Sequence, residues 1–108
     1  MRQCEVYIHN CKAGILTENS RDDYEFNYDK DYLDRQDAVP VSLTLPLSKT
    51  VYRSKVLFPF FFNMLSEGDN RELQSRLLHI DKDDDFGILL ATAQYDTIGA
   101  VTVKPIVG

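Results

Sequence analysis

Two cysteines and two histidines are the residues of this chain that could bind a transition metal. Cys4, His9 and Cys11 lie close together near the start, and thiolate and imidazole groups are ligands that Zn²⁺ prefers. Their spacing matches no common zinc pattern, and a fourth ligand would have to be His79, far along the chain. We therefore expect no metal site, with Cys4 as a small buried strand residue and Cys11 in a turn.

Aspartates in the second half give a further metal candidate. Asp81, Asp83 and Asp85 follow the D-x-D-x-D opening of a calcium-binding loop. That loop requires glycine at its sixth position and glutamate at its twelfth, where this chain has Phe86 and Thr92. Acidic residues just before a helix interact favourably with the helix dipole, so we interpret the run as a helix start.

Catalysis and nucleotide binding have little support in the sequence. Catalysis needs convergent groups, but His9 falls in an expected turn and His79 at the end of an expected helix, where a cation is stabilised by the dipole. The five glycines are scattered singly and form no phosphate-binding pattern. We expect no catalytic residue and no cofactor, so the chain alone is not expected to be an enzyme.

Apolar residues that alternate with polar ones predict the strands of the first half. Tyr24–Tyr28 places three aromatic residues on one face. In Val41–Leu47 the alternation directs Val41, Leu43 and Leu45 to the core, and Pro46 ends the strand or places it at an edge. The other expected elements are a hairpin of residues 5–8 and 13–16 around a turn with Asn10, a polar loop over 19–23, and a helical turn within 29–37.

Helical spacing dominates the second half. Pro59 suits the first turn of a helix that contains Phe60, Phe61, Met64 and Leu65. Two further helices and a last strand are expected: one helix capped by Asp69 or Asn70 and running through Leu73, Leu77 and Leu78, one over residues 86–90, and a strand over 98–103. The fold class is therefore α+β, a single domain over residues 1–108 with a small antiparallel β-sheet and about three short helices packed on one side. The expected core residues are Val6, Ile8, Leu16, Phe26, Leu43, Leu45, Leu65, Leu77, Leu89 and Val101.

Composition narrows the classes of partner. The 108 residues carry a net charge of −5, and the lysines and arginines form no patch, which disfavours direct binding of nucleic acid or anionic lipid. The longest apolar run, 56–62, is too short to span a membrane. Residues 1–8 alternate polar and apolar types, unlike a secretion signal, so we expect a cytoplasmic protein with reduced thiols.

Aromatic crowding gives the one candidate for a binding surface. Phe58, Phe60, Phe61 and Phe62 are more than one face of one helix can bury. Either all four pack into the core, or one or two stay exposed and anchor a protein partner, since aromatic residues are enriched in interface hot spots. The expected partner-binding residues are Tyr52, Arg53, Phe58, Phe60, Phe61 and Phe62, with the loop 47–55 beside them.

Three segments resemble one known family. Pro40–Leu47, P-V-S-L-T-L-P-L, is similar to the P-L-S-L-S-L-P-L signature of the N-terminal domain of HipA-type toxin kinases. Phe60–Gly68 resembles that domain's F-F-x-N-L-L-P-E-G segment, with Ser66 in place of the proline. Gly99–Pro105 is similar to its G-A-V-T-L-x-P close. The resemblance covers nearly the whole chain.

The resemblance implies a binding role. The ATP-binding and catalytic residues of the HipA family lie beyond this domain, so it implies no kinase activity. In the three-component relatives called HipBST the domain is a separate protein, HipS, which binds and neutralises the kinase HipT, with the helix-turn-helix protein HipB as third member. We therefore expect a HipS-like bacterial antitoxin that binds a HipT/HipA-type serine/threonine kinase, with a HipB-like protein in a ternary complex.

Two alternatives stay open. The chain could be a structural or activating subunit of a split HipA-type kinase, or the N-terminal fragment of a longer HipA kinase. Met1 directly before the first strand and the stop shortly after Pro105 favour a natural small protein.

Overall fold

One antiparallel sheet organises the computed structural model, which describes residues 2–63, 76–77, 79–80, 84–92 and 101–106. Within these residues the sheet has five strands in the order β4-β3-β2-β1-β5, with every neighbouring pair antiparallel. The strands are β1 (Arg2–Ile8), β2 (Cys11–Ser20), β3 (Asp23–Tyr28), β4 (Val51–Ser54) and β5 (Val101–Pro105). The first four strands are neighbours in chain order, and the last returns to pair with the first.

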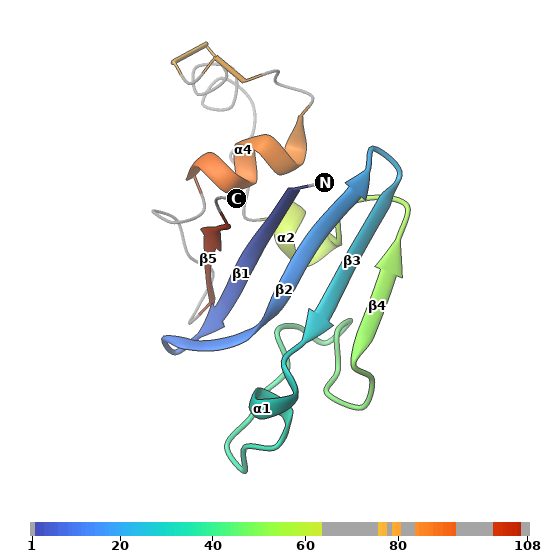
Figure 1. Ribbon diagram of the computed structural model, residues 1–108, viewed down its shortest axis with the longest axis vertical. Coiled ribbons are helices and arrows are strands. Elements are labelled where there is room, and N and C mark those ends of the chain that lie inside the picture. The colour runs from blue at the N-terminus through green and yellow to red at the C-terminus, as the bar shows by residue number, and fades with distance from the viewer. Residues whose placement is uncertain (1, 64–75, 78, 81–83, 93–100, 107–108) are drawn as a thin grey trace.

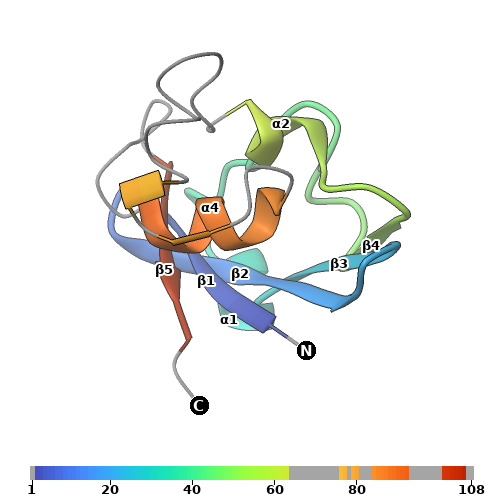
Figure 2. The ribbon, with the colours of Figure 1, turned by 90° about the horizontal axis from the view of Figure 1, so that it is seen from above.

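Three helices belong to the described part: α1 (Lys30–Leu33), α2 (Pro59–Phe62) and α4 (Asp85–Thr92). Figure 2 shows α2 and α4 on the same face of the sheet, and Figure 1 shows α1 beyond the end of β3. The ring of Phe61 in α2 lies 5.9 Å from that of Phe26, and the ring of Phe86 in α4 lies 6.2 Å from that of Tyr24. The α+β prediction is confirmed, and the core lies between the sheet and these two helices (Figure 2).

The opening hairpin matches its prediction. His9 and Asn10 form the turn, with φ of 50° and 66°. Positive φ at both turn residues is what a two-residue hairpin turn needs to match the twist of its strands. The strands run longer than residues 5–8 and 13–16, because the alternation of buried and half-buried residues continues to Arg2 and through Thr17. In β3 the three tyrosine and phenylalanine residues of Tyr24–Tyr28 are all buried, which confirms the shared aromatic face.

The predicted strand over 41–47 is wrong. Val41 and Leu45 are buried, but the segment is a loop with a turn at Ser42, and Leu43 is 97% exposed instead of facing the core. Pro40 directly before the segment and Pro46 within it lack amide hydrogens, which limits the ladder hydrogen bonds that a strand could form there. The backbone of Val41 and Leu45 hydrogen-bonds instead to the Tyr28 hydroxyl.

Residues 47–55, expected to be a loop, contain the edge strand β4. Its pairing with β3 sets Tyr52 opposite Phe26 and Arg53 opposite Glu25. β4 has four residues, two of them exposed, so it shows no apolar alternation long enough to predict a strand.

Most of the remaining expectations hold. The helical turn at Tyr32, the helix start at Pro59 and the helix over 86–90 are present as α1, α2 and α4. Leu77, expected in the core, is 69% exposed. Met64, Leu65, residues 69–75 and the first part of the 98–103 strand lie outside the described residues. The other expected core residues are buried: Val6, Ile8, Leu16, Phe26, Leu45, Leu89 and Val101.

Candidate partner-binding surface

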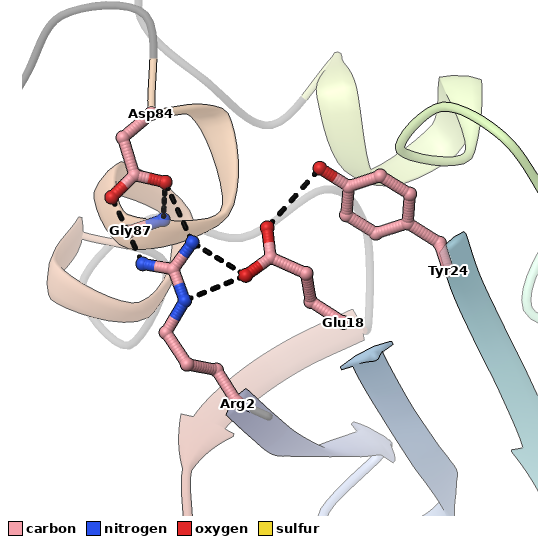
Figure 3. Close-up of polar contacts among 5 residues, drawn as sticks. All are labelled: Arg2, Glu18, Tyr24, Asp84 and Gly87. Carbon is pink, nitrogen blue, oxygen red and sulfur yellow. Dashed lines mark hydrogen bonds and ion pairs between the residues drawn. The ribbon is translucent and has the colours of Figure 1, made fainter. Parts of the chain in front are cut away.

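A polar cluster joins the ends of β1 and β2 to the start of α4. The Arg2 guanidinium donates to both carboxylate oxygens of Asp84, at 2.9 Å and 2.7 Å, and to Glu18 at 2.8 Å (Figure 3). Asp84 also accepts the Gly87 amide at 3.1 Å and so caps α4. Burial, with Glu18 beside it, raises the pKa of Tyr24 to about 12, so its hydroxyl stays protonated and donates to Glu18. The members of this cluster satisfy one another, as in a structural contact between elements.

Cys4, His9 and Cys11, the first candidates for metal ligands, have different environments. Cys4 is fully buried in β1, and burial raises the pKa of its thiol to about 12. Cys11, which was expected in the turn, is instead the half-buried first residue of β2, and His9 lies in the exposed turn before it. Among the described residues no group of three or more His, Cys, Asp or Glu side chains could hold a metal ion. Asp81 and Asp83 lie outside the described residues.

The face of the sheet opposite α2 and α4 is polar. The Lys12 ammonium lies 3.4 Å from Glu5, and the Arg53 guanidinium lies 3.0 Å from Glu25. The Lys104 ammonium stands 4.8 Å from the ring centre of Tyr7 on the same face. These contacts between neighbouring strands describe a solvated sheet face. No helix among the described residues is long and apolar enough to cross a membrane.

The α2 aromatics divide into two pairs. Phe58 and Phe61 are 7% and 0% exposed and belong to the core. Phe60 is half-buried with its ring 5.5 Å from that of Phe61, and Phe62 is 39% exposed. Phe61 fixes α2 on the sheet, and Phe60 and Phe62 carry the accessible aromatic surface.

Tyr52 and Arg53 do not form one rim with these rings. Because successive strand residues point to opposite faces, Tyr52 lies on the helix-covered face and Arg53 on the polar face. The Tyr52 hydroxyl donates to the Pro46 carbonyl at 2.6 Å, and its ring packs edge-on against Tyr28. The structure therefore places the six predicted residues in three settings: the core, the α2 surface and the polar sheet face.

Other exposed apolar side chains were not identified from the sequence as surface residues. Leu43 is 97% exposed, Val56 65% and Val39 43%. The signal available for Leu43 was its position between two prolines, which argues for a loop as strongly as the alternation argues for a strand. Together with Phe62, these residues are among the exposed large apolar side chains of the described residues.

The fold and this surface define a small α+β domain with exposed apolar side chains and, in the described residues, no assembled metal site. The chain belongs to the HipA N-terminal domain family, whose model matches residues 4–104. A solved structure described as the N-terminal domain of HipA toxin has the same fold, with a TM-score of 0.72 over 99% of this chain and 94% of that chain at 24% identity.

Two relatives show how the domain occurs. An uncharacterised protein of Haemophilus influenzae is 29% identical over 104 residues, which cover 96% of this chain and 92% of that protein. The putative kinase Y4mE of Sinorhizobium fredii is 28% identical over 105 residues, which cover 97% of this chain but only 25% of that protein. The domain thus forms nearly all of one relative and a quarter of the other.

Proposed function

We propose that the chain is a non-catalytic binding module, a HipS-like antitoxin that binds a HipT/HipA-type serine/threonine kinase in the cytoplasm and neutralises it. The observation that carries this proposal is the double occurrence of the domain, as a quarter of a putative kinase and as nearly all of a small protein. A domain surface that packs within one chain can dock between two chains, if the contacts offset the entropy of association.

Inhibition follows when the domain binds the inactive arrangement of the kinase more tightly than the active one. A ligand shifts a conformational equilibrium only by its differential affinity for the two states. The same docking would activate the kinase if the active arrangement were favoured, which is the alternative of a split-kinase subunit. A HipB-like DNA-binding protein is the expected third member, since the net charge of −5 disfavours direct binding of DNA by this chain.

The accessible α2 aromatics, Phe60 and Phe62, are the proposed contact, and Arg53, which lies on the opposite face of the sheet, is left out of it. Phe58 and Phe61 support them from the core, and Tyr52 holds the loop before β4. We expect Phe62→Ala to weaken kinase binding about tenfold, as loss of an interface aromatic does. Ile106→Ala is the matched control, because Ile106 is 38% exposed and Phe62 39%.

The deciding experiment measures autophosphorylation of a purified HipT/HipA-type kinase from the same genome, with and without an equimolar amount of the chain. Loss of activity together with a stable complex on gel filtration supports the antitoxin role. Gain of activity supports the split-kinase subunit instead. If no complex forms, both roles are wrong.

A further inference from the structure

The loop between α1 and β4 exposes an apolar side chain that the fold does not use. Leu43 is 97% exposed, and Val39 in the same segment is 43% exposed. Residues 38–48 contain no charged side chain, although 27% of the whole sequence is charged. Single exposed leucines are common on protein surfaces, so exposure alone assigns no role to Leu43. What sets this residue apart is how firmly its loop is held.

Three tyrosine hydroxyls pin residues 39–46, which we call the pinned loop. The Tyr32 hydroxyl donates to the Val39 carbonyl at 2.7 Å and accepts the Val39 amide at 3.0 Å. The Tyr28 hydroxyl accepts the Val41 amide at 2.9 Å and donates to the Leu45 carbonyl. With the bond from Tyr52 to Pro46, the contacts come from α1, β3 and β4.

Local contacts complete the shape of the loop tip. The Leu45 amide donates to the Ser42 carbonyl at 3.1 Å, and the Ser42 and Thr44 hydroxyls lie 2.8 Å apart. Val41 and Leu45, two residues before and after Leu43, are 5% and 1% exposed. The backbone on both sides of Leu43 is therefore anchored in the core while its side chain points to solvent.

We propose that Leu43 is an apolar anchor that inserts into an uncharged, apolar pocket on the kinase; this rests on the function proposed above. Because the loop is already ordered, little conformational entropy is lost when it docks. The absence of charge over residues 38–48 matches an apolar pocket and not a basic one. The kinase is the occupant because the relative Y4mE has three-quarters of its length beyond the matched domain, and that part is next to the domain in the same chain.

The test measures the affinity of the purified kinase for the full chain by titration calorimetry, with Leu43→Lys and Leu43→Ala. We expect Leu43→Ala to weaken binding about tenfold and Leu43→Lys about 100-fold, since a lysine would have to leave water. The melting temperature of both free variants should equal that of the wild type, because the side chain is 97% exposed.

Leu77→Lys is the matched control. Leu77 is 69% exposed, and residues 76–77 lie at the opposite end of the molecule from the pinned loop in Figure 1. This variant should bind within about twofold of the wild type.

If the wild type binds and Leu43→Lys binds equally well, the anchor is refuted while the proposed function stands. If the wild type does not bind the kinase, the proposed function is refuted and the anchor with it. If sedimentation shows a dimer of the free chain that Leu43→Lys dissociates, the occupant is a second copy and the proposal is wrong.

Discussion

Arg2 and Asp84 form a bidentate ion pair that joins the first strand to the N-terminal cap of α4, across 82 residues of sequence. The same Arg2 side chain stands 5.4 Å from the ring centre of the buried Phe86. Asp84 therefore has two separable tasks, since it pairs with Arg2 and also caps α4 through the Gly87 amide.

Replacement of Asp84 should separate the two tasks. Asn accepts a capping hydrogen bond as well as Asp does, so Asp84→Asn removes the charge pair and keeps the cap. We expect it to lower the free energy of unfolding by about 1 kcal/mol, because the pair is partly exposed to solvent. Asp84→Ala loses both contacts and should lower it by about 2 kcal/mol. Urea denaturation measures both values, and equal stability of the two variants would show that the charge pair contributes nothing beyond the cap.

The same pair predicts how stability depends on pH. The hydrogen bond from Arg2 lowers the pKa of Asp84 below its ordinary value of 3.8. A lowered folded pKa adds stability that is complete above the unfolded pKa and is lost as the pH falls through the folded value. The stability difference between the wild type and Asp84→Asn should therefore be full at about pH 6 and shrink below about pH 4.

Asp22→Asn provides the control for this pH series. Asp22 lies in the exposed turn between β2 and β3, and its replacement removes the same charge without touching Arg2. Denaturation of all three proteins between about pH 6 and pH 2 gives the comparison. A difference between the wild type and Asp84→Asn that stays constant down to the lowest pH would contradict the assignment.

The two thiols should differ in reactivity. Cys4 is fully buried, and burial raises the pKa of its thiol to about 12, whereas Cys11 is half-buried at the start of β2. The thiolate is the reactive form of cysteine. A thiol reagent should therefore label Cys11 quickly, and Cys4 only as the chain unfolds. Cys11→Ser should remove the fast phase and Cys4→Ala the slow one. Two fast phases in the wild type would show that β1 opens readily.

Where the sequence predicts this fold well, the elements have strong periodicity and a local start signal. Tyr24–Tyr28 alternates without interruption, Asn10 accepts the positive φ of the hairpin, and Pro59 starts α2. The short edge strand β4 was not predicted from the sequence, because half of its residues are exposed and it pairs with one neighbouring strand only. The family motifs identified the class of protein correctly, and the comparisons confirm it.

The surface was harder to predict, because exposure depends on contacts between distant residues. The sequence did not indicate which of the four neighbouring phenylalanines would be buried. In the structure Phe61 is fully buried, with its ring against the Phe26 ring of β3. In the 41–47 segment the alternation was misleading, since Val41 and Leu45 are buried as expected but Leu43 is exposed. The turn from Ser42 to Leu45 leaves the Leu43 side chain pointing to solvent. The tyrosine hydroxyls that hydrogen-bond to the loop backbone come from three other elements, so the sequence of the loop alone does not reveal them.

Tyr28 should therefore be the residue on which the pinned loop most depends. Burial raises the pKa of its hydroxyl to about 12, so the hydroxyl stays protonated and both donates to Leu45 and accepts from Val41. Tyr28→Phe leaves these backbone groups without that partner, which should lower the free energy of unfolding by about 1–3 kcal/mol. Hydrogen exchange of the Val41 amide should accelerate more than that of the β1–β2 hairpin, because the loop opens locally.

Tyr7→Phe is the control for this variant. Tyr7 lies on the polar sheet face, and the phenylalanine ring keeps the contact with Lys104. This change should alter stability by less than about 0.5 kcal/mol, as surface substitutions usually do. If Tyr28→Phe leaves the Val41 amide as protected as in the wild type, the hydroxyl does not hold the loop. Packing of Val41 and Leu45 in the core would then be enough to fix Leu43 in place.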